Sequence, residues 1–248
     1  MPQLHSSNKK LGRSALWYWR RFLLTFIPFL LFSLCLFPII VMHWFYFQYF
    51  FYQSWWGLVV FPFFLLISLV ILFLCCLFIT AGVIRLFHIT YNEGTYPYTL
   101  KEKNVFHWML VCQLYTPMRK LLDAVPLGSI KTIYLRTLGM KIGSNCLVGG
   151  VIKDPCMTSF GDNVTMGEYA VLYAHIHDKS TNTLHIQPVT IGYNCVIGAG
   201  ALIMPGVQMK RGSVVGAGGL VPKNCVLNKG KTYIGHPVKE KTKRQGKG

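Results

Sequence analysis

Three histidines that lie close together in the sequence are the side chains best suited to chemistry in this chain. His175, His177 and His185 are three of its eight histidines. A neutral imidazole has a pKa of about 6.5, so it can accept and release a proton near physiological pH. Asp178 follows directly and could orient an imidazole, although an aspartate in a loop can equally face solvent. Three histidines would also suffice to ligate a metal ion.

An apolar residue recurs every sixth position on both sides of these histidines. The recurring positions are Ile142, Val148, Asp154, Phe160, Met166 and Leu172, and then Ile191, Ile197, Ile203, Met209, Val215, Val221 and Leu227. Asp154 is the polar exception. A period of six fits neither an α-helix nor a simple alternating strand. It is typical of a parallel β-helix, in which short strands stack coil on coil around an apolar interior.

The repeat is lost after Leu172 and resumes at Ile191, so the histidine-rich segment should leave the coil as a loop. Loops on a rigid scaffold commonly carry function. Asn145, Asn163 and Asn194 are expected at the corners of the coil, because asparagine tolerates the positive φ that tight corners need.

The repeats resemble those of the left-handed β-helix acyltransferases, the isoleucine-patch group that acylates hydroxyls or amines. The segment 197–224 is similar to the closing coils of that family, and YIGHPVK (233–239) is similar to its G-x-P-A-K ending, with Val238 in place of the usual alanine. The resemblance covers about residues 139–239. It implies an all-β, left-handed parallel β-helix for this part of the chain.

The resemblance also implies a chemistry: transfer of an acetyl group from acetyl-CoA, most simply to a hydroxyl, with a histidine as general base and without a metal. His175, in YAHIHD, matches the family's catalytic histidine best, and His177 is the alternative. His185 and Asp178 are expected on the acceptor side. The residues expected to contact the acyl-CoA donor are Gly198, Ala199, Gly216, Ala217, Lys210, Arg211 and Lys223. In the family the donor lies between neighbouring β-helices, which implies a homotrimer.

The first half of the chain is of a different kind, because residues 22–84 contain no Asp, Glu, Lys or Arg. A helix needs about 20 apolar residues to cross a bilayer, so this segment predicts a two-helix transmembrane hairpin with spans near 22–46 and 56–84. It is far too long for a signal peptide. The spans contain three prolines that are expected to kink them, Pro28, Pro38 and Pro62.

Charge predicts the orientation of the hairpin. The basic residues that flank the spans are Lys9, Lys10, Arg13, Arg20 and Arg21 before the first, and Arg85, Lys101 and Lys103 after the second. The turn carries none, so the positive-inside rule puts both termini and the β-helix in the cytoplasm, as an integral protein of the inner or plasma membrane. Eight cysteines without a CxxC pair agree with a reducing compartment.

The net charge of +17 suggests an anionic partner. Basic segments beside membrane helices are attracted to an anionic inner leaflet. Nucleic acid is not expected as a partner, because no recognition motif accompanies the charge.

Four parts are expected along the chain. They are a basic N-terminus with two transmembrane helices (1–91), a helical membrane-surface linker (92–138), the β-helix acyltransferase domain (139–238) and a basic disordered tail (239–248). Within the linker we expect a turn at 94–98, a helix over 102–122 that Pro117 interrupts, and a short helix over 129–140 that packs on the first coil.

The order of these pieces also resembles the C-terminal region of ε-poly-L-lysine synthetase-type membrane proteins, over most of residues 60–239. Two other functions therefore stay open. One is a non-catalytic β-helix that scaffolds or gates a membrane complex. The other is a metal-dependent hydratase of the γ-carbonic anhydrase type with three histidine ligands, against which the acyltransferase-like closing coils argue. The sequence does not name the acceptor, for which a glycan or a lipid-linked molecule near the bilayer is the first hypothesis.

Overall fold

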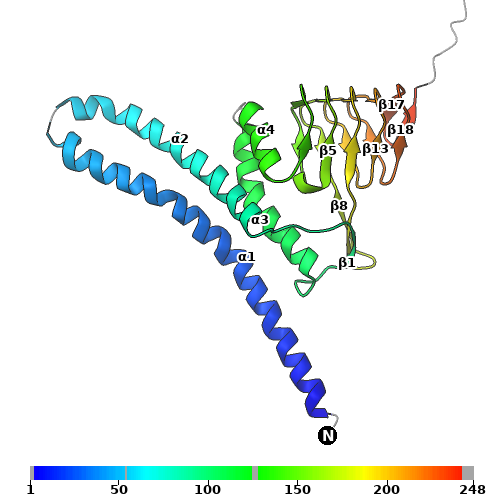
Figure 1. Cartoon of the computed structure of the whole chain (residues 1–248), viewed down its shortest axis with the longest axis horizontal. Coiled ribbons are helices and arrows are strands. Elements are labelled where there is room, and N and C mark those ends of the chain that lie inside the picture. Colours follow the sequence, from blue (N-terminus) through cyan, green and yellow to red (C-terminus); the bar gives the residue numbers. More distant parts are fainter. Residues whose placement is uncertain (1–2, 54, 125–127, 242–248) are drawn as a thin grey trace, which may run out of the picture. The chain divides into compact units, whose positions relative to one another are not determined.

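The computed structural model describes residues 3–53, 55–124 and 128–241, with side chains from residue 15 onward (Figure 1). The described residues fall into two compact units. One unit is built from the chain up to Ile89 together with 106–121, and the other from 90–105 together with the chain from Leu122 onward. The segment 92–138 is thus shared between the two units.

The first unit contains two long apolar helices joined by a tight turn. α1 (Gln3–Tyr46) continues into a short π-helix (Phe47–Phe51), and α2 (Trp55–Leu86) returns beside α1. The Tyr46 ring stacks on Phe64 at 4.1 Å between centroids. Gly57 lets the chain close on itself here, because a Cβ at this position would approach the Phe51 Cα to 2.8 Å.

Two segments are long and apolar enough to cross a membrane, judged by length and composition: Ala15–Phe51 and Trp55–Leu86. The predicted pair of apolar helices is therefore present, and each is longer than the predicted span. Many of their large apolar side chains are exposed, for example Phe29 and Phe63. The helices run continuously through their three prolines, Pro28, Pro38 and Pro62.

The linker helix α3 (Lys103–Ala124) is also continuous, so the prediction that Pro117 interrupts it is wrong. A proline inside a helix costs about 3 kcal/mol, because it removes a backbone hydrogen bond and crowds the preceding turn. Burial of one helix face offsets this cost. Leu110, Leu114 and Met118, spaced four residues apart, are all almost fully buried.

The second unit is a parallel β-helix whose short strands stack in three sheets (Figure 1). Face 1 consists of β2 (Lys141–Ile142), β5 (Thr158–Phe160), β10 (Val189–Ile191), β13 (Gln208–Met209) and β16 (Val226–Leu227). Face 2 consists of β3 (Leu147–Val148), β6 (Thr165–Met166), β11 (Val196–Ile197), β14 (Val214–Val215) and β17 (Thr232–Gly235). Face 3 consists of β4 (Val151–Ile152), β7 (Val171–Leu172), β12 (Leu202–Ile203) and β15 (Leu220–Val221). The predicted β-helix architecture is confirmed.

The last residue of each two-residue strand points into the coil, and the six-residue series is confirmed except at one position. Ile152 occupies the first rung of face 3, where it pairs with Leu172, and Asp154 lies beyond the strand. The spacing is therefore four residues from Val148 to Ile152 and eight from Ile152 to Phe160. Gly150 makes the short corner possible, because a Cβ there would collide with the Ala170 carbonyl oxygen. The first corner is thus two residues shorter than the repeat, and the next corner, which contains Asp154, is two residues longer.

The predicted corner asparagines are confirmed. Asn145, Asn163 and Asn194 have φ of 57°, 56° and 56° at the corners between faces 1 and 2. Their side chains form a ladder: Asn145 Nδ2 donates to Asn163 Oδ1 and Asn163 Nδ2 donates to Asn194 Oδ1, both at 3.1 Å. Gly212 and Gly230 take the same left-handed conformation in the later coils.

The histidine-rich segment leaves the coil as a hairpin rather than an irregular loop. β8 (His175–Asp178) and β9 (Thr183–Ile186) pair antiparallel, and β1 (Gly94–Pro97) pairs with the other edge of β9. The sheet order is β1-β9-β8. The predicted turn at 94–98 is therefore wrong, because this segment is drawn into extended structure by pairing with β9. Figure 1 shows β8 leaving the stack of coils toward β1.

Both ends of the coil stack are covered. α4 (Gly128–Thr137) contacts β2 and β3, which confirms the short helix predicted to pack on the first coil. At the far end β18 (Val238–Glu240) adds antiparallel to β17. Lys239 and Glu240 of the predicted disordered tail thus lie in a strand, and residues 242–248 are outside the described part of the chain.

Candidate active site

Asp154 and His175 form a hydrogen-bonded pair where the hairpin leaves the coil. Both lie at corners between face 3 and face 1, Asp154 after β4 and His175 one coil later, after β7. The His175 Nδ1 lies 2.7 Å from Asp154 Oδ2 and 2.9 Å from Oδ1. The backbone N–H of Ala174 donates to Oδ2 at 2.9 Å. The extended corner therefore places Asp154, the polar exception in the six-residue series, within hydrogen-bond distance of His175, the histidine that matches the family best.

The surroundings of this pair define which nitrogen of His175 can react. Asp154 is fully buried, whereas the His175 side chain is 16% exposed. An ionised carboxylate only accepts hydrogen bonds, so His175 donates from Nδ1. The other ring nitrogen, Nε2, then carries the lone pair that can accept a proton. The arrangement is that of a general base held by a buried carboxylate.

Two more side chains donate hydrogen bonds to Asp154, one to its carboxylate and one to its backbone. The Tyr91 hydroxyl donates to Asp154 Oδ1 at 3.0 Å, and the Thr158 hydroxyl donates to the Asp154 backbone carbonyl at 2.9 Å. Burial is the main cause that raises the pKa of the Cys156 thiol to about 11; a hydrogen bond with Tyr91 opposes this rise, and the nearby Asp154 carboxylate adds to it. Asp154 and Tyr91 were not predicted as site residues. The polar residue in an apolar series was the available signal for Asp154, and no sequence signal marked Tyr91.

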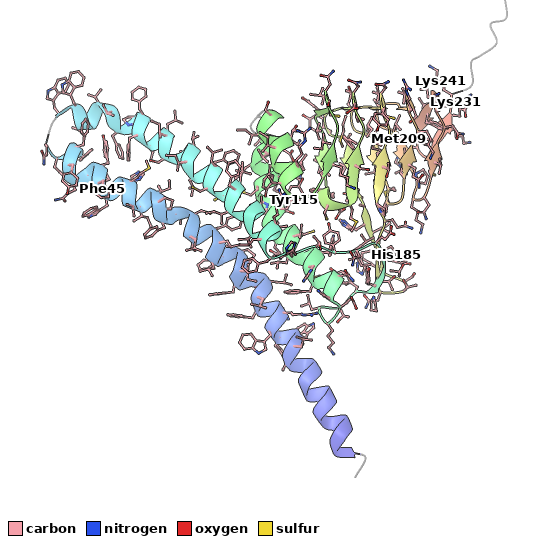
Figure 2. All side chains as sticks on the ribbon, viewed as in Figure 1. Phe45, Tyr115, His185, Met209, Lys231 and Lys241 are labelled. Atoms are coloured by element: carbon pink, nitrogen blue, oxygen red, sulfur yellow. The ribbon has the colours of Figure 1, made fainter. Side chains whose placement is uncertain are left out.

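The other two histidines of the segment have different partners. The His177 ring packs on Tyr98 at 4.0 Å between centroids, and its side chain is exposed. The His185 Nδ1 is 2.7 Å from the Thr95 hydroxyl, and its Nε2 is 3.1 Å from the Thr183 hydroxyl. Figure 2 shows His185 away from the stacked coils that contain Met209. His185 thus links β9 to β1.

Asp178 lies at the turn of the hairpin and not against an imidazole. Its Oδ1 accepts from the Ser180 hydroxyl at 2.6 Å and from the Ser180 N–H at 2.8 Å. These bonds lower the pKa of Asp178 to about 2. The carboxylate therefore stays ionised at neutral pH and holds the turn.

The residues expected to contact the donor lie at three different corners of the coil. Lys223 is on the corner column between faces 3 and 1, two coils beyond His175. The pair Lys210 and Arg211 is on the column between faces 1 and 2. The small residues stack on the column between faces 2 and 3, and they are Gly198, Ala199, Gly216 and Ala217. A single chain does not bring these three groups together.

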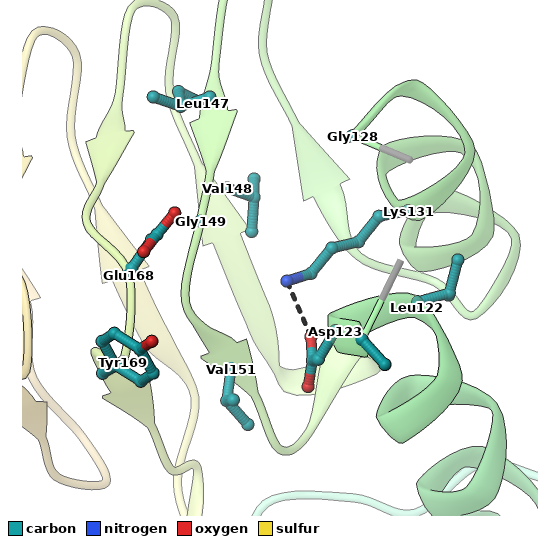
Figure 3. A pocket seen from close by; sticks show the side chains of 11 residues that line it. Leu122, Asp123, Gly128, Lys131, Leu147, Val148, Gly149, Val151, Glu168 and Tyr169 are labelled. Atoms are coloured by element: carbon teal, nitrogen blue, oxygen red, sulfur yellow. Dashed lines mark hydrogen bonds and ion pairs between the residues drawn. The ribbon is translucent and has the colours of Figure 1, made fainter. Parts of the chain in front are cut away.

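A cavity of about 620 Å³ lies at the corner between faces 2 and 3 in the first coils, and it contains none of the predicted site residues (Figure 3). Within it Lys131 of α4 donates from Nζ to Asp123 at 2.9 Å and to the Gly150 carbonyl at 2.8 Å. These bonds attach α4 and the end of α3 to the first coil. Exposed Tyr169 lines the opposite wall with a φ of 59°.

The three histidines do not come together as metal ligands. Among the described residues no group of three or more His, Cys, Asp or Glu is placed to hold a metal ion. The ring nitrogens of His185 face threonine hydroxyls, and His175 Nδ1 faces Asp154. A γ-carbonic anhydrase-type site built on His175, His177 and His185 is therefore not supported.

Comparison with known proteins identifies the family. The family profile "Hexapeptide repeat of succinyl-transferase" matches residues 188–221. The chain is 32% identical over 136 residues to "Putative acetyltransferase YvoF" of Bacillus subtilis (strain 168), and the match covers 52% of this chain and 71% of that protein. The chain therefore belongs to the hexapeptide-repeat acetyltransferase family, whose fold is the left-handed β-helix.

Two further proteins are similar to this chain, one over a shorter segment and one at lower sequence identity. "Putative acetyltransferase C18B11.09c" of Schizosaccharomyces pombe (strain 972 / ATCC 24843) is 33% identical over 91 residues, which is 35% of this chain and less than half, 43%, of that protein. The solved structure of a maltose O-acetyltransferase from Clostridium difficile 630 aligns over 53% of this chain and 84% of that chain, at 20% identity and a TM-score of 0.39.

Proposed function

We propose that this protein transfers an acetyl group from acetyl-CoA to a hydroxyl of a glycan or lipid-linked acceptor, with His175 as general base. The observation that carries the proposal is the His175–Asp154 pair at 2.7 Å. Burying a carboxylate costs free energy, and Asp154 is nevertheless fully buried at the corner from which the histidine-rich hairpin leaves. A purely structural coil has no need of such a pair, which favours an enzyme over a scaffold.

The proposed reaction balances with these groups. Nε2 of His175 takes the proton of the acceptor hydroxyl while the oxygen attacks the thioester carbonyl of acetyl-CoA, giving a tetrahedral intermediate. The intermediate collapses with cleavage of the carbon–sulfur bond. The leaving thiolate takes the proton back from the imidazolium, which releases the CoA thiol and the acetyl ester. Asp154 holds the Nδ1–H throughout and stabilises the imidazolium.

The acceptor would bind along the hairpin. Side chains two residues apart on a strand lie on the same face, so His177 and its partner Tyr98 lie on the same side of β8 as His175. In this pair His177 is exposed and Tyr98 is half-buried, and the two rings offer an apolar platform for a sugar ring. His185 and Asp178 stabilise the hairpin and would support the acceptor from behind this platform.

The donor site is proposed to need more than one copy of the chain. The candidate donor residues lie on three corner columns, and a threefold assembly would bring corners of neighbouring copies together. The outward side chains of face 3 add support, because all four are apolar and only half-buried: Val151, Val171, Leu202 and Leu220. We therefore propose a homotrimer with acyl-CoA held between neighbours.

The apolar helices are proposed to anchor the enzyme in a membrane. Both helices are long enough to cross a bilayer, and basic residues flank them on the side of the termini. The β-helix would then face cytoplasmic acetyl-CoA, and the basic segments would lie against an anionic inner leaflet.

The decisive experiment compares His175→Ala with His177→Ala in the purified full-length protein. The assay measures transfer of radiolabelled acetyl from acetyl-CoA to the glycan and glycolipid fraction of membrane extracts. Loss of the general base should lower kcat about 10²–10⁴-fold. His177→Ala should act mainly on the acceptor KM, because His177 contacts Tyr98 and not Asp154.

Two outcomes contradict the assignment. If activity survives His175→Ala and disappears in His177→Ala, the two histidines exchange roles. If both variants keep full activity, the base lies elsewhere and the proposed mechanism is wrong.

A further inference from the structure

Asp154 needs partners that donate hydrogen bonds, because it is a carboxylate with no exposed surface. On Oδ2 it accepts from the Ala174 N–H at 2.9 Å and from His175 Nδ1 at 2.7 Å. On Oδ1 it accepts from the Tyr91 hydroxyl at 3.0 Å. Tyr91 therefore donates to Oδ1, whereas the Ala174 N–H donates to Oδ2.

Tyr91 does not come from the β-helix. It lies in the short segment between the end of α2 at Leu86 and β1, and it is 63 residues distant from Asp154 in sequence. Its side chain is almost fully buried, with 2% of its surface exposed. The segment that follows the second apolar helix thus contributes a side chain to the floor of the candidate site.

Asp154 sets the direction of the Tyr91 hydroxyl. Asp154 only accepts, so the phenolic proton points to Oδ1. Tyr91 therefore serves as a hydrogen-bond donor to Asp154.

We propose that Tyr91 is a positioning residue of the transferase: through Asp154 it fixes the orientation and the tautomer of His175. The inference rests on the proposed role of His175 as general base. Both carboxylate oxygens lie within hydrogen-bond distance of His175 Nδ1, at 2.7 and 2.9 Å, so a modest rotation of the carboxylate changes the direction of that bond. The Tyr91 hydroxyl opposes this rotation by holding Oδ1.

Loss of the hydroxyl should act on the chemical step and not on substrate binding. Without Tyr91 the carboxylate reorients, the Nδ1–H tautomer loses support, and a fraction of His175 carries its proton on Nε2. That fraction cannot accept a proton from the acceptor. The expected signature is a lower kcat with unchanged KM for acetyl-CoA and for the acceptor.

The test uses Tyr91→Phe in the full-length protein, which keeps the buried ring and removes the hydroxyl. We expect kcat to fall about 10- to 100-fold, the range that one hydrogen bond to a charged group can supply. The matched control is Tyr96→Phe. Its hydroxyl lies in the same segment, but it donates to the backbone carbonyls of Asn92 and Glu93, so kcat should not change.

A double variant separates positioning from a general structural role. If Tyr91 acts through Asp154, then Tyr91→Phe costs nothing further in an Asp154→Asn background. If the two losses multiply instead, or if Tyr96→Phe lowers kcat as much as Tyr91→Phe, the proposal is overturned.

A readout that does not depend on activity completes the test. The ¹⁵N spectrum of the His175 ring reports the tautomer, and Tyr91→Phe should reduce the Nδ1–H share. An unchanged tautomer overturns the positioning role even if His175 proves to be the base. Conversely, full activity of His175→Ala would refute the proposed function. The His175 tautomer, measured in the wild type and in Tyr91→Phe, would still report whether Tyr91 acts on Asp154.

Discussion

The Cys156 thiol, beside the candidate site, is held in its neutral form by the fold. Burial is the main cause that raises its pKa from 9.0 to about 11, and the Asp154 carboxylate adds to it. Because the folded pKa lies above the unfolded one, the folded state favours the protonated thiol. This contribution to stability is fully present below about pH 9 and is lost as the pH rises through about 11.

We therefore expect the melting temperature of the full-length protein in detergent to fall more steeply between pH 8 and 11 in the wild type than in Cys156→Ala. Tyrosine and lysine side chains titrate in the same range, but they do so in both proteins, and the difference between the two curves isolates the thiol. Parallel curves would show that Cys156 gains no protection from its surroundings. The measurement is thermal denaturation followed by circular dichroism.

At the residue scale, the sequence predicted the histidine but not its partners. The six-residue count placed Asp154 on the inward ladder, because a fixed period cannot reveal a corner shortened by two residues and another lengthened by two. The short corner depends on Gly149 and Gly150 packing against the next coil. Tyr91 could not be predicted, since its contact with Asp154 is formed by tertiary structure alone.

At the scale of elements, the three-stranded sheet β1-β9-β8 holds the hairpin on which the acceptor is proposed to bind. The cross-strand pair Thr95 and His185 joins β1 to β9 through a hydroxyl–imidazole contact of 2.7 Å. A hydrogen bond of this kind contributes about 1 kcal/mol, which corresponds to about a fivefold change in an opening equilibrium. The stability of the hairpin should therefore depend measurably on this one contact.

Thr95→Val removes the hydroxyl and keeps the shape of the side chain. Amide hydrogen exchange in 94–96 and 183–186 should become several-fold faster, because the edge strand opens more often. The matched control is Thr165→Val on the exposed side of face 2, which should leave exchange in the hairpin unchanged. Equal exchange rates in Thr95→Val and the wild type would show that backbone pairing alone holds β1.

Elements with a local signal were predicted, and elements that depend on distant partners were not. The stacked strands and α4 follow from short-range patterns in 128–235. β1 follows from pairing with a segment about 90 residues later, and its Gly and Pro residues indicated a turn. α3 continues through Pro117 because its buried face outweighs the lost hydrogen bond.

At the scale of the whole molecule, the proposed orientation decides whether the candidate site can meet cytoplasmic acetyl-CoA. Epitope tags at either terminus should be protected from external protease in intact cells and cleaved after permeabilisation. A tag inserted at the turn between the two apolar helices, at residues 52–53, should be cleaved in intact cells and serves as the internal control. Cleavage of a terminal tag from outside would reverse the topology.

The capped stack of coils has a consequence for where motion occurs. In a solenoid each coil contacts only its neighbours, so opening begins at an end and spreads from there. α4 is bonded to the first coil through Lys131, and among the described residues β18 adds to the edge of face 2 at the other end. Asp154 and His175 belong to adjacent coils near the α4 end. Asp154 and His175 are separated from the last described coil by the coils of β10–β12 and β13–β15, so fraying that starts at that coil must pass through both before it reaches the pair.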